Sequence, residues 1–107
     1  MSNQYTYTLE KLGVAIEQLA TLPGDVRERL KEAFLVFHTL TDKDFPSNLK
    51  ADWLWVMAEL TKYGAVLDHK GVPMIGSVEN TMKKIRKATG TKIAQKIYEL
   101  YWAVKNT

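Results

Sequence analysis

Apolar residues recur every three or four positions along most of the chain, which is the spacing of one face of an α-helix. In the first such segment they are Leu9, Leu12, Ile16 and Leu19. The pattern predicts a helix that begins near Thr8, whose side chain can cap it. The helix is expected to end at Leu22-Pro23-Gly24, because proline lacks an amide hydrogen and disfavours helical geometry before it.

A second apolar stripe follows at Val26, Leu30, Ala33, Phe34 and Phe37. Asp25 stands just before this stripe and Glu28 lies three residues later, which is the arrangement of a capping box. Turn-forming residues and a proline at positions 41–46 end the predicted helix.

The third helix is predicted from Asn48 to Tyr63, with Ser47 as its cap and Gly64 at its C-terminal boundary. One face of it is apolar and carries Leu49, Trp53, Val56, Met57 and Leu60. Three more apolar residues point elsewhere: Leu54, Trp55 and Ala58. A helix that is apolar over most of its circumference lies inside a domain or at an interface.

Helical periodicity is absent between Gly64 and Gly76. Two short apolar runs there flank the turn-forming residues Asp68-His69-Lys70-Gly71, which predicts a short β-hairpin or a structured loop near residues 65–75. Pro73 would confine its strand to an edge of the sheet.

Two basic helices complete the pattern. The fourth is capped by Ser77 and has Val78, Met82 and Ile85 facing inwards. A break is predicted at residues 88–91, with Gly90 suited to the left-handed C-terminal position. The last helix runs from Lys92 to about Lys105, with an apolar stripe at Ile93, Ile97, Leu100 and Val104. The chain is therefore predicted to be all-α, with about five helices in a compact bundle-like single domain over residues 1–107.

Composition narrows the class of protein. The 107 residues include no cysteine, which excludes disulfides, thiol nucleophiles and cysteine metal sites. Small secreted domains often depend on disulfides, so we expect a cytoplasmic location. Residues 1–13 lack the basic and apolar pattern of a signal peptide, and no window approaches the ~18 apolar residues of a membrane span.

Charge is unevenly distributed along the chain. Residues 1–49 carry five Lys/Arg against seven Asp/Glu, whereas residues 70–107 carry eight against two. Five basic residues form a candidate contact for an anion or nucleic acid: Lys83, Lys84, Arg86, Lys87 and Lys92. A helix-turn-helix is not expected, because a turn at Gly90 would place Lys96 and Glu99 at positions that must be apolar. General attraction to phosphates remains, as does the ordinary alternative of solvated helix faces.

Residues typical of catalysis are few. His38 and His69 are the only histidines, and neither has metal-ligand spacing to the other. His38 is predicted to lie near a helix C-terminus, where its side chain can cap the helix and interact favourably with the helix dipole. The Asp68–His69 pair could act in acid–base chemistry or hold a small ligand, although such a pair is more often simply part of a turn. No enzyme activity, cofactor or metal is expected.

The tryptophans indicate an interface. Trp53 and Trp55 point about 200° apart on a helix, so either their helix is enclosed on two sides or one indole reaches the surface. Trp102 and Tyr98 also lie off the main stripe of their helix. The predicted partner interface comprises Trp53, Trp55, Trp102 and Tyr98. The function predicted first is a small non-catalytic interaction or regulatory domain that self-associates, and the alternative is a nucleic-acid-binding accessory protein.

Overall fold

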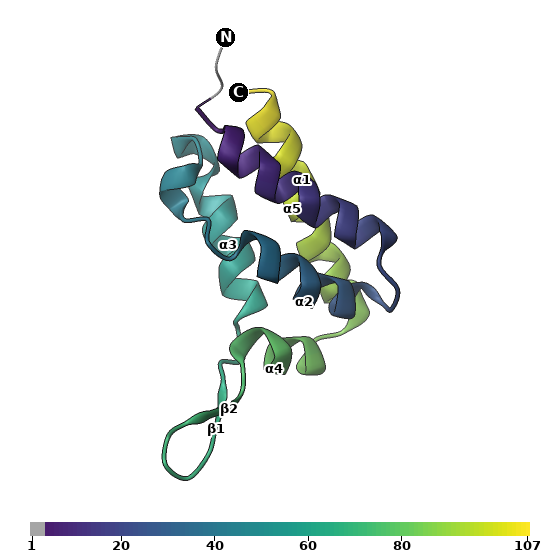
Figure 1. The fold of residues 1–107 in the computed structure, drawn as a ribbon, viewed down its shortest axis with the longest axis vertical. Helices are drawn as coiled ribbons and strands as arrows, with labels where there is room; N and C mark the ends of the chain where they lie inside the picture. Colours follow the sequence, from purple (N-terminus) through teal and green to yellow (C-terminus); the bar gives the residue numbers. More distant parts are fainter. Residues whose placement is uncertain (1–3) are drawn as a thin grey trace.

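The computed structural model describes residues 4–107, which form five α-helices and one β-hairpin (Figure 1). The helices are α1 (Thr6–Thr21), α2 (Val26–Phe37), α3 (Lys50–Leu60), α4 (Ser77–Lys84) and α5 (Lys87–Lys105). Two short 3-10 helices, η1 (Asp42–Asp44) and η2 (Ser47–Leu49), connect α2 to α3. The strands are β1 (Val66–Leu67) and β2 (Pro73–Ile75). The prediction of an all-α fold with about five helices is confirmed, and the segment near residues 65–75 is the hairpin.

The helices stack in two layers, and the hairpin extends beyond them. In Figure 1, α1 and α2 lie in front of α3 and α5, and the hairpin hangs below the helices. The Cα atoms span 53 × 29 × 18 Å, and the shortest dimension fits two layers of helices with axes about 8–10 Å apart. The radius of gyration, 14.4 Å, exceeds the ~13 Å expected for a compact chain of this length, because the hairpin projects.

Three aromatic rings lie at the centre of the core. The Trp53 indole stacks on Phe45 with ring centroids 4.8 Å apart, and meets Phe37 edge-on at 5.2 Å. Offset and edge-on aromatic pairs of this kind contribute about 0.5–1.5 kcal/mol beyond the area they bury. Each of the five helices adds further buried side chains, such as Leu12, Leu30, Val56, Met82 and Ile97.

The first helix begins two residues earlier than predicted. Thr8 is not its cap but a buried residue within α1, and its hydroxyl donates a 2.7 Å hydrogen bond to the Asp44 carbonyl. That bond satisfies a carbonyl of η1, which lies against the buried side of α1. Local capping preference therefore predicted the wrong role for Thr8, because its hydroxyl donates to a carbonyl 36 residues further along the chain.

The start of α2 has a cap that also joins two helices. Asp25 accepts a 2.8 Å hydrogen bond from the Arg27 amide, as predicted for an N-cap. Glu28 was expected to complete a capping box, but its carboxylate pairs with Lys31 at 3.1 Å. The Arg27 guanidinium binds the Asp25 carboxylate at 2.9 Å and donates to the Ile85 carbonyl at 3.0 Å. Through this contact α2 holds the chain between α4 and α5.

The break between α4 and α5 lies earlier than predicted. Ile85 and Arg86 are extended and separate the two helices, so residues 88–91 are helical and Lys92 lies inside α5. Gly90 is buried within α5, and a Cβ there would lie 3.0 Å from Val26 Cγ1. This glycine allows α2 and α5 to approach each other, and it does not form a turn. Its helical spacing from Ile93 and Ile97 fits that role.

Helix α3 is also shorter than predicted. Ser47 belongs to η2 and makes no side-chain cap, and the α-helix runs only from Lys50 to Leu60. Gly64 follows with φ of +66°, the left-handed conformation that glycine adopts without strain. Gly64 was predicted to end α3, but it lies in the turn that follows the C-cap residue Thr61.

The base of the hairpin is attached to α4 by polar contacts. The Asn80 side-chain amide donates to the Tyr63 carbonyl at 3.3 Å and to the Gly64 carbonyl at 3.0 Å. The Tyr63 amide donates to the Thr81 hydroxyl at 3.1 Å. Asn80 and Thr81 are both buried, so these bonds fix the direction in which the hairpin leaves the helices.

Candidate interaction surfaces

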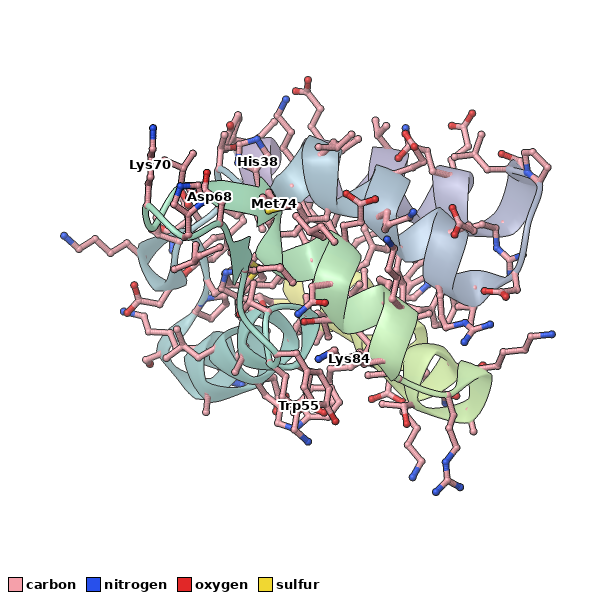
Figure 2. The ribbon with its side chains drawn as sticks, turned by 90° about the horizontal axis from the view of Figure 1, so that it is seen from below. His38, Trp55, Asp68, Lys70, Met74 and Lys84 are labelled. Carbon is pink, nitrogen blue, oxygen red and sulfur yellow. The ribbon has the colours of Figure 1, made fainter. Side chains whose placement is uncertain are left out.

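The side of α3 that faces solvent is entirely apolar. Its exposed positions are occupied by Ala51, Leu54, Trp55 and Ala58, which we call the α3 face. The charged residues of this helix, Lys50, Asp52 and Glu59, occupy half-buried positions beside that face. Viewed from the hairpin end, Trp55 lies on the side of the molecule away from α1 and α2 (Figure 2). The outer layer of the molecule therefore exposes an uncharged strip on α3.

Spacing within the α3 face is that of a helix-packing surface. The four residues are separated by three, one and three positions, so they form one continuous stripe along two turns. Small alanines lie at both ends and the large Leu54 and Trp55 lie in the middle. Stripes at this spacing are the anchors by which amphipathic helices dock on partners.

Trp53 is removed from the predicted interface. Only 1% of it is exposed, against 39% of Trp55. The two indoles point in opposite directions, as helical geometry requires, and Trp55 is the one that reaches the surface. Trp53 is a core residue and has no surface with which to contact a partner.

Tyr98 and Trp102 form a second aromatic surface on α5. Both are exposed, and their ring centroids lie 6.4 Å apart. Tyr98 also borders an open hollow of about 450 Å³ between α1, α2 and α5, floored by Leu19, Val26 and Ala94. The side of α5 that meets α3 carries Lys96, whose Nζ lies 3.9 Å from Asp52. Tyr98 and Trp102 lie about 160° and 120° around the helix from Lys96, so they do not join the α3 face.

The five basic residues are exposed but do not form one stripe. Lys83 borders a mixed-charge hollow whose lining includes three carboxylates, those of Asp25, Glu28 and Glu79, together with Arg27 and Lys31. Lys84 lies over the Tyr63 ring at 5.6 Å, on a different side of α4. Arg86 lies in the break between α4 and α5, Lys87 begins α5, and Lys92 is exposed further along α5. The arrangement disperses their charge and places some of it beside carboxylates.

The Asp68–His69 pair belongs to the hairpin turn. Asp68 Oδ1 accepts hydrogen bonds from the Lys70 amide at 2.8 Å and the Val72 amide at 2.9 Å. His69 is exposed at the tip. The carboxylate thus organises the turn, which supports the simple reading of this motif. His38 is exposed after α2, and its ring stacks on Phe34 at 5.6 Å.

A groove between α2 and the start of α4 was not predicted. It measures about 370 Å³ and is lined by Lys31, Glu32, Phe34, Leu35, Gly76, Val78 and Glu79. Leu35 is 64% exposed, and on the adjacent hairpin Met74 is 68% exposed. An apolar residue outside the buried stripe was the signal that singled out Trp55. The same signal at Leu35, which lies outside the predicted stripe of α2, could have found this groove.

No group of three or more His, Asp or Glu side chains within residues 4–107 could hold a metal ion. No helix in this range is long and apolar enough to cross a membrane.

The Asp25 carboxyl is the acidic group of this region whose titration is most altered. Its hydrogen bonds to the Arg27 guanidinium and amide hold the pKa of this carboxyl well below its usual range. The contact stabilises the α2 start and lies in the wall of the mixed-charge hollow that contains Lys83.

Comparison with known proteins adds no assignment to these surfaces. No protein-family model, no curated protein and no solved structure is significantly similar to this chain.

Proposed function

We propose that this protein is a small non-catalytic interaction domain that self-associates through the α3 face. The observation that carries the proposal is the composition of that face, where every exposed position is apolar. Exposed apolar surface costs free energy in water. Packing a helix stripe of this kind against another helix removes that cost. Trp55 supplies the central aromatic anchor, the residue type most enriched at interface centres.

The order of residues favours a second copy as the partner. Read in either direction, the α3 face runs small, large, large, small, from Ala51 through Leu54 and Trp55 to Ala58. Two antiparallel copies related by a two-fold axis between Leu54 and Trp55 would place Ala51 of one copy opposite Ala58 of the other. A two-fold interface requires this kind of self-complementarity.

The size of the face sets the expected strength. Four side chains on one helix bury a few hundred Å² on each partner, below the ~800 Å² per partner of a standard interface. We therefore expect association in the micromolar range or weaker, with exchange between monomers and assemblies.

Single-cysteine cross-linking tests the pairing, because the natural chain contains no cysteine. Ala51→Cys and Ala58→Cys chains are mixed and mildly oxidised, and the mixed disulfide dimer is expected to dominate. Either variant alone should cross-link poorly, because equivalent residues lie about 10 Å apart along the helix axes in the antiparallel pair. Leu54→Glu in both chains should abolish the mixed product, since it places two carboxylates near the two-fold axis.

Val14→Glu is the matched control, because Val14 is an exposed apolar residue on α1. It should leave the mixed A51C–A58C product unchanged. Two results would overturn the proposal: equal cross-linking in all combinations, or a mixed product that persists in the L54E background.

A further inference from the structure

We propose that the hairpin is an arm that docks into the α2–α4 groove of a second copy of this chain. The arm comprises residues 66–75, and the groove is floored by Phe34, Leu35 and Val78. This contact is a second interaction surface, separate from the α3 face, and it does not depend on the function proposed above.

The arm exposes apolar side chains that the fold does not use. Leu67, Val72 and Met74 are all exposed, and Met74 is among the most exposed apolar residues of the molecule. A two-stranded hairpin is marginally stable by itself, and it gains stability when it packs on another surface. Figure 1 shows the arm extending away from the helices, so its outer part packs on no helix of its own chain.

The groove has the shape and composition to receive such side chains. It is an open hollow of about 370 Å³, accessible from the surface to a side chain of another molecule. Apolar atoms form most of its surface, and Leu35, one of its lining residues, is 64% exposed. One or two apolar side chains of the arm would fill it.

Charge favours the arm over other apolar occupants. Lys31 on the groove rim already pairs with Glu28, whereas Glu32 and Glu79 form no ion pair within residues 4–107. The rim therefore has an excess of negative charge. The tip of the arm carries Lys70, which also forms no ion pair within these residues and points away from the ribbon in Figure 2. The Lys70 ammonium at the tip and the acidic rim attract each other, whereas the neighbouring Asp68 carboxylate is hydrogen-bonded to the amides of its own turn.

Position on the chain allows a reciprocal exchange. Gly76 lines the groove and follows directly after β2, so each copy carries the arm and the groove side by side. In a two-fold pair each arm crosses to the other copy's groove, and every contact forms twice. Met74 and Lys70 lie on the same side of the molecule as His38 at the end of α2, and Trp55 lies on the opposite side (Figure 2). The arm and the α3 face can therefore act in the same assembly.

Cross-linking between copies tests the docking directly. Met74→Cys chains are mixed with Leu35→Cys chains and mildly oxidised. Each chain has one cysteine, so a mixed disulfide can form only between copies. The expected product is an M74C–L35C dimer that exceeds the dimer from M74C mixed with Val14→Cys by at least fivefold. Equal yields from the two mixtures would overturn the proposal.

A charge exchange separates docking from random collision. Lys70→Glu should lower the yield of the mixed product, and Glu79→Lys in the partner chain should restore it. The expected change is about two- to fivefold, as for exposed ion pairs. If neither Lys70→Glu nor Glu79→Lys alters the yield, the charge on the groove rim does not select the arm.

Sedimentation velocity distinguishes failure of this proposal from failure of the α3 pairing. Two different two-fold contacts assemble the wild-type chain beyond a dimer. Met74→Asp should stop assembly at an α3-paired dimer, and Leu54→Glu should stop it at an arm-exchanged dimer. The double variant should be a monomer. If M74D alone leaves the wild-type distribution unchanged, the arm does not dock, whatever the result for L54E.

Discussion

The two sides of α3 have nearly the same composition but opposite surroundings. On the inner side, Trp53 is enclosed by Phe37 and Phe45 and stabilises the fold. On the outer side, Trp55 and Leu54 are exposed between two alanines. Two residues of separation decide between these locations, because they rotate a side chain by about 200°. Hydrophobicity alone therefore does not identify a core residue, and an apolar residue off the buried stripe indicates a surface with another role.

The largest expected effect tests this comparison through stability. Trp53→Ala should lower the free energy of unfolding by about 3–5 kcal/mol, because it removes a buried indole and leaves a cavity between two rings. Trp55→Ala should cost about 1 kcal/mol or less, since much of its indole contacts solvent. Urea unfolding followed by circular dichroism at low concentration measures both. Equal losses for the two variants would remove the distinction between the two sides.

A second prediction applies the comparison to α5, with one residue inserted at two positions. Gly90→Leu should destabilise the fold by about 1–3 kcal/mol, because its Cβ alone would lie 3.0 Å from Val26. Ala88→Leu, at an exposed position two residues earlier, should be neutral within about 0.5 kcal/mol. Thermal unfolding of the two variants measures the difference. If G90L is as stable as A88L, Gly90 is not a close contact between α2 and α5.

Predictions from the sequence succeeded where one pattern dominated. The number of helices, the hairpin and the Asp25 cap follow from periodicity, turn chemistry and capping. The wrong predictions at Thr8 and Gly90 share one cause, which is that each residue was assigned a local role while a distant contact uses it. Thr8 binds Asp44 in place of capping α1, and Gly90 admits Val26 in place of forming a turn.

The interaction surfaces divide in the same way. The opposite orientation of Trp53 and Trp55 could be predicted, because helical geometry fixes it within α3. The apolar Leu35 outside the stripe of α2 could have been noticed, but its partner across the groove could not, because Val78 belongs to another helix and only tertiary packing brings the two to one surface. The dispersal of the basic residues was equally inaccessible, since it depends on where α4 ends and which carboxylates approach Lys83.

The smallest expected effect concerns the ion pair between Asp25 and Arg27. Both side chains are partly exposed, so their burial is intermediate between that of Trp53 and that of Trp55. The pKa of the Asp25 carboxyl is lowered by Arg27, so folding favours its ionised form. The stabilisation is therefore fully present above the unfolded pKa of about 3.9 and is lost as pH falls below it. Asp25→Asn should lose this contribution, so its stability should approach that of the wild type below pH 4. Arg27→Gln should show the same pH dependence, with an added pH-independent loss from the Ile85 carbonyl contact. Urea unfolding between pH 3 and 7 measures both, and a constant difference between D25N and wild type would show that the pair makes no ionic contribution.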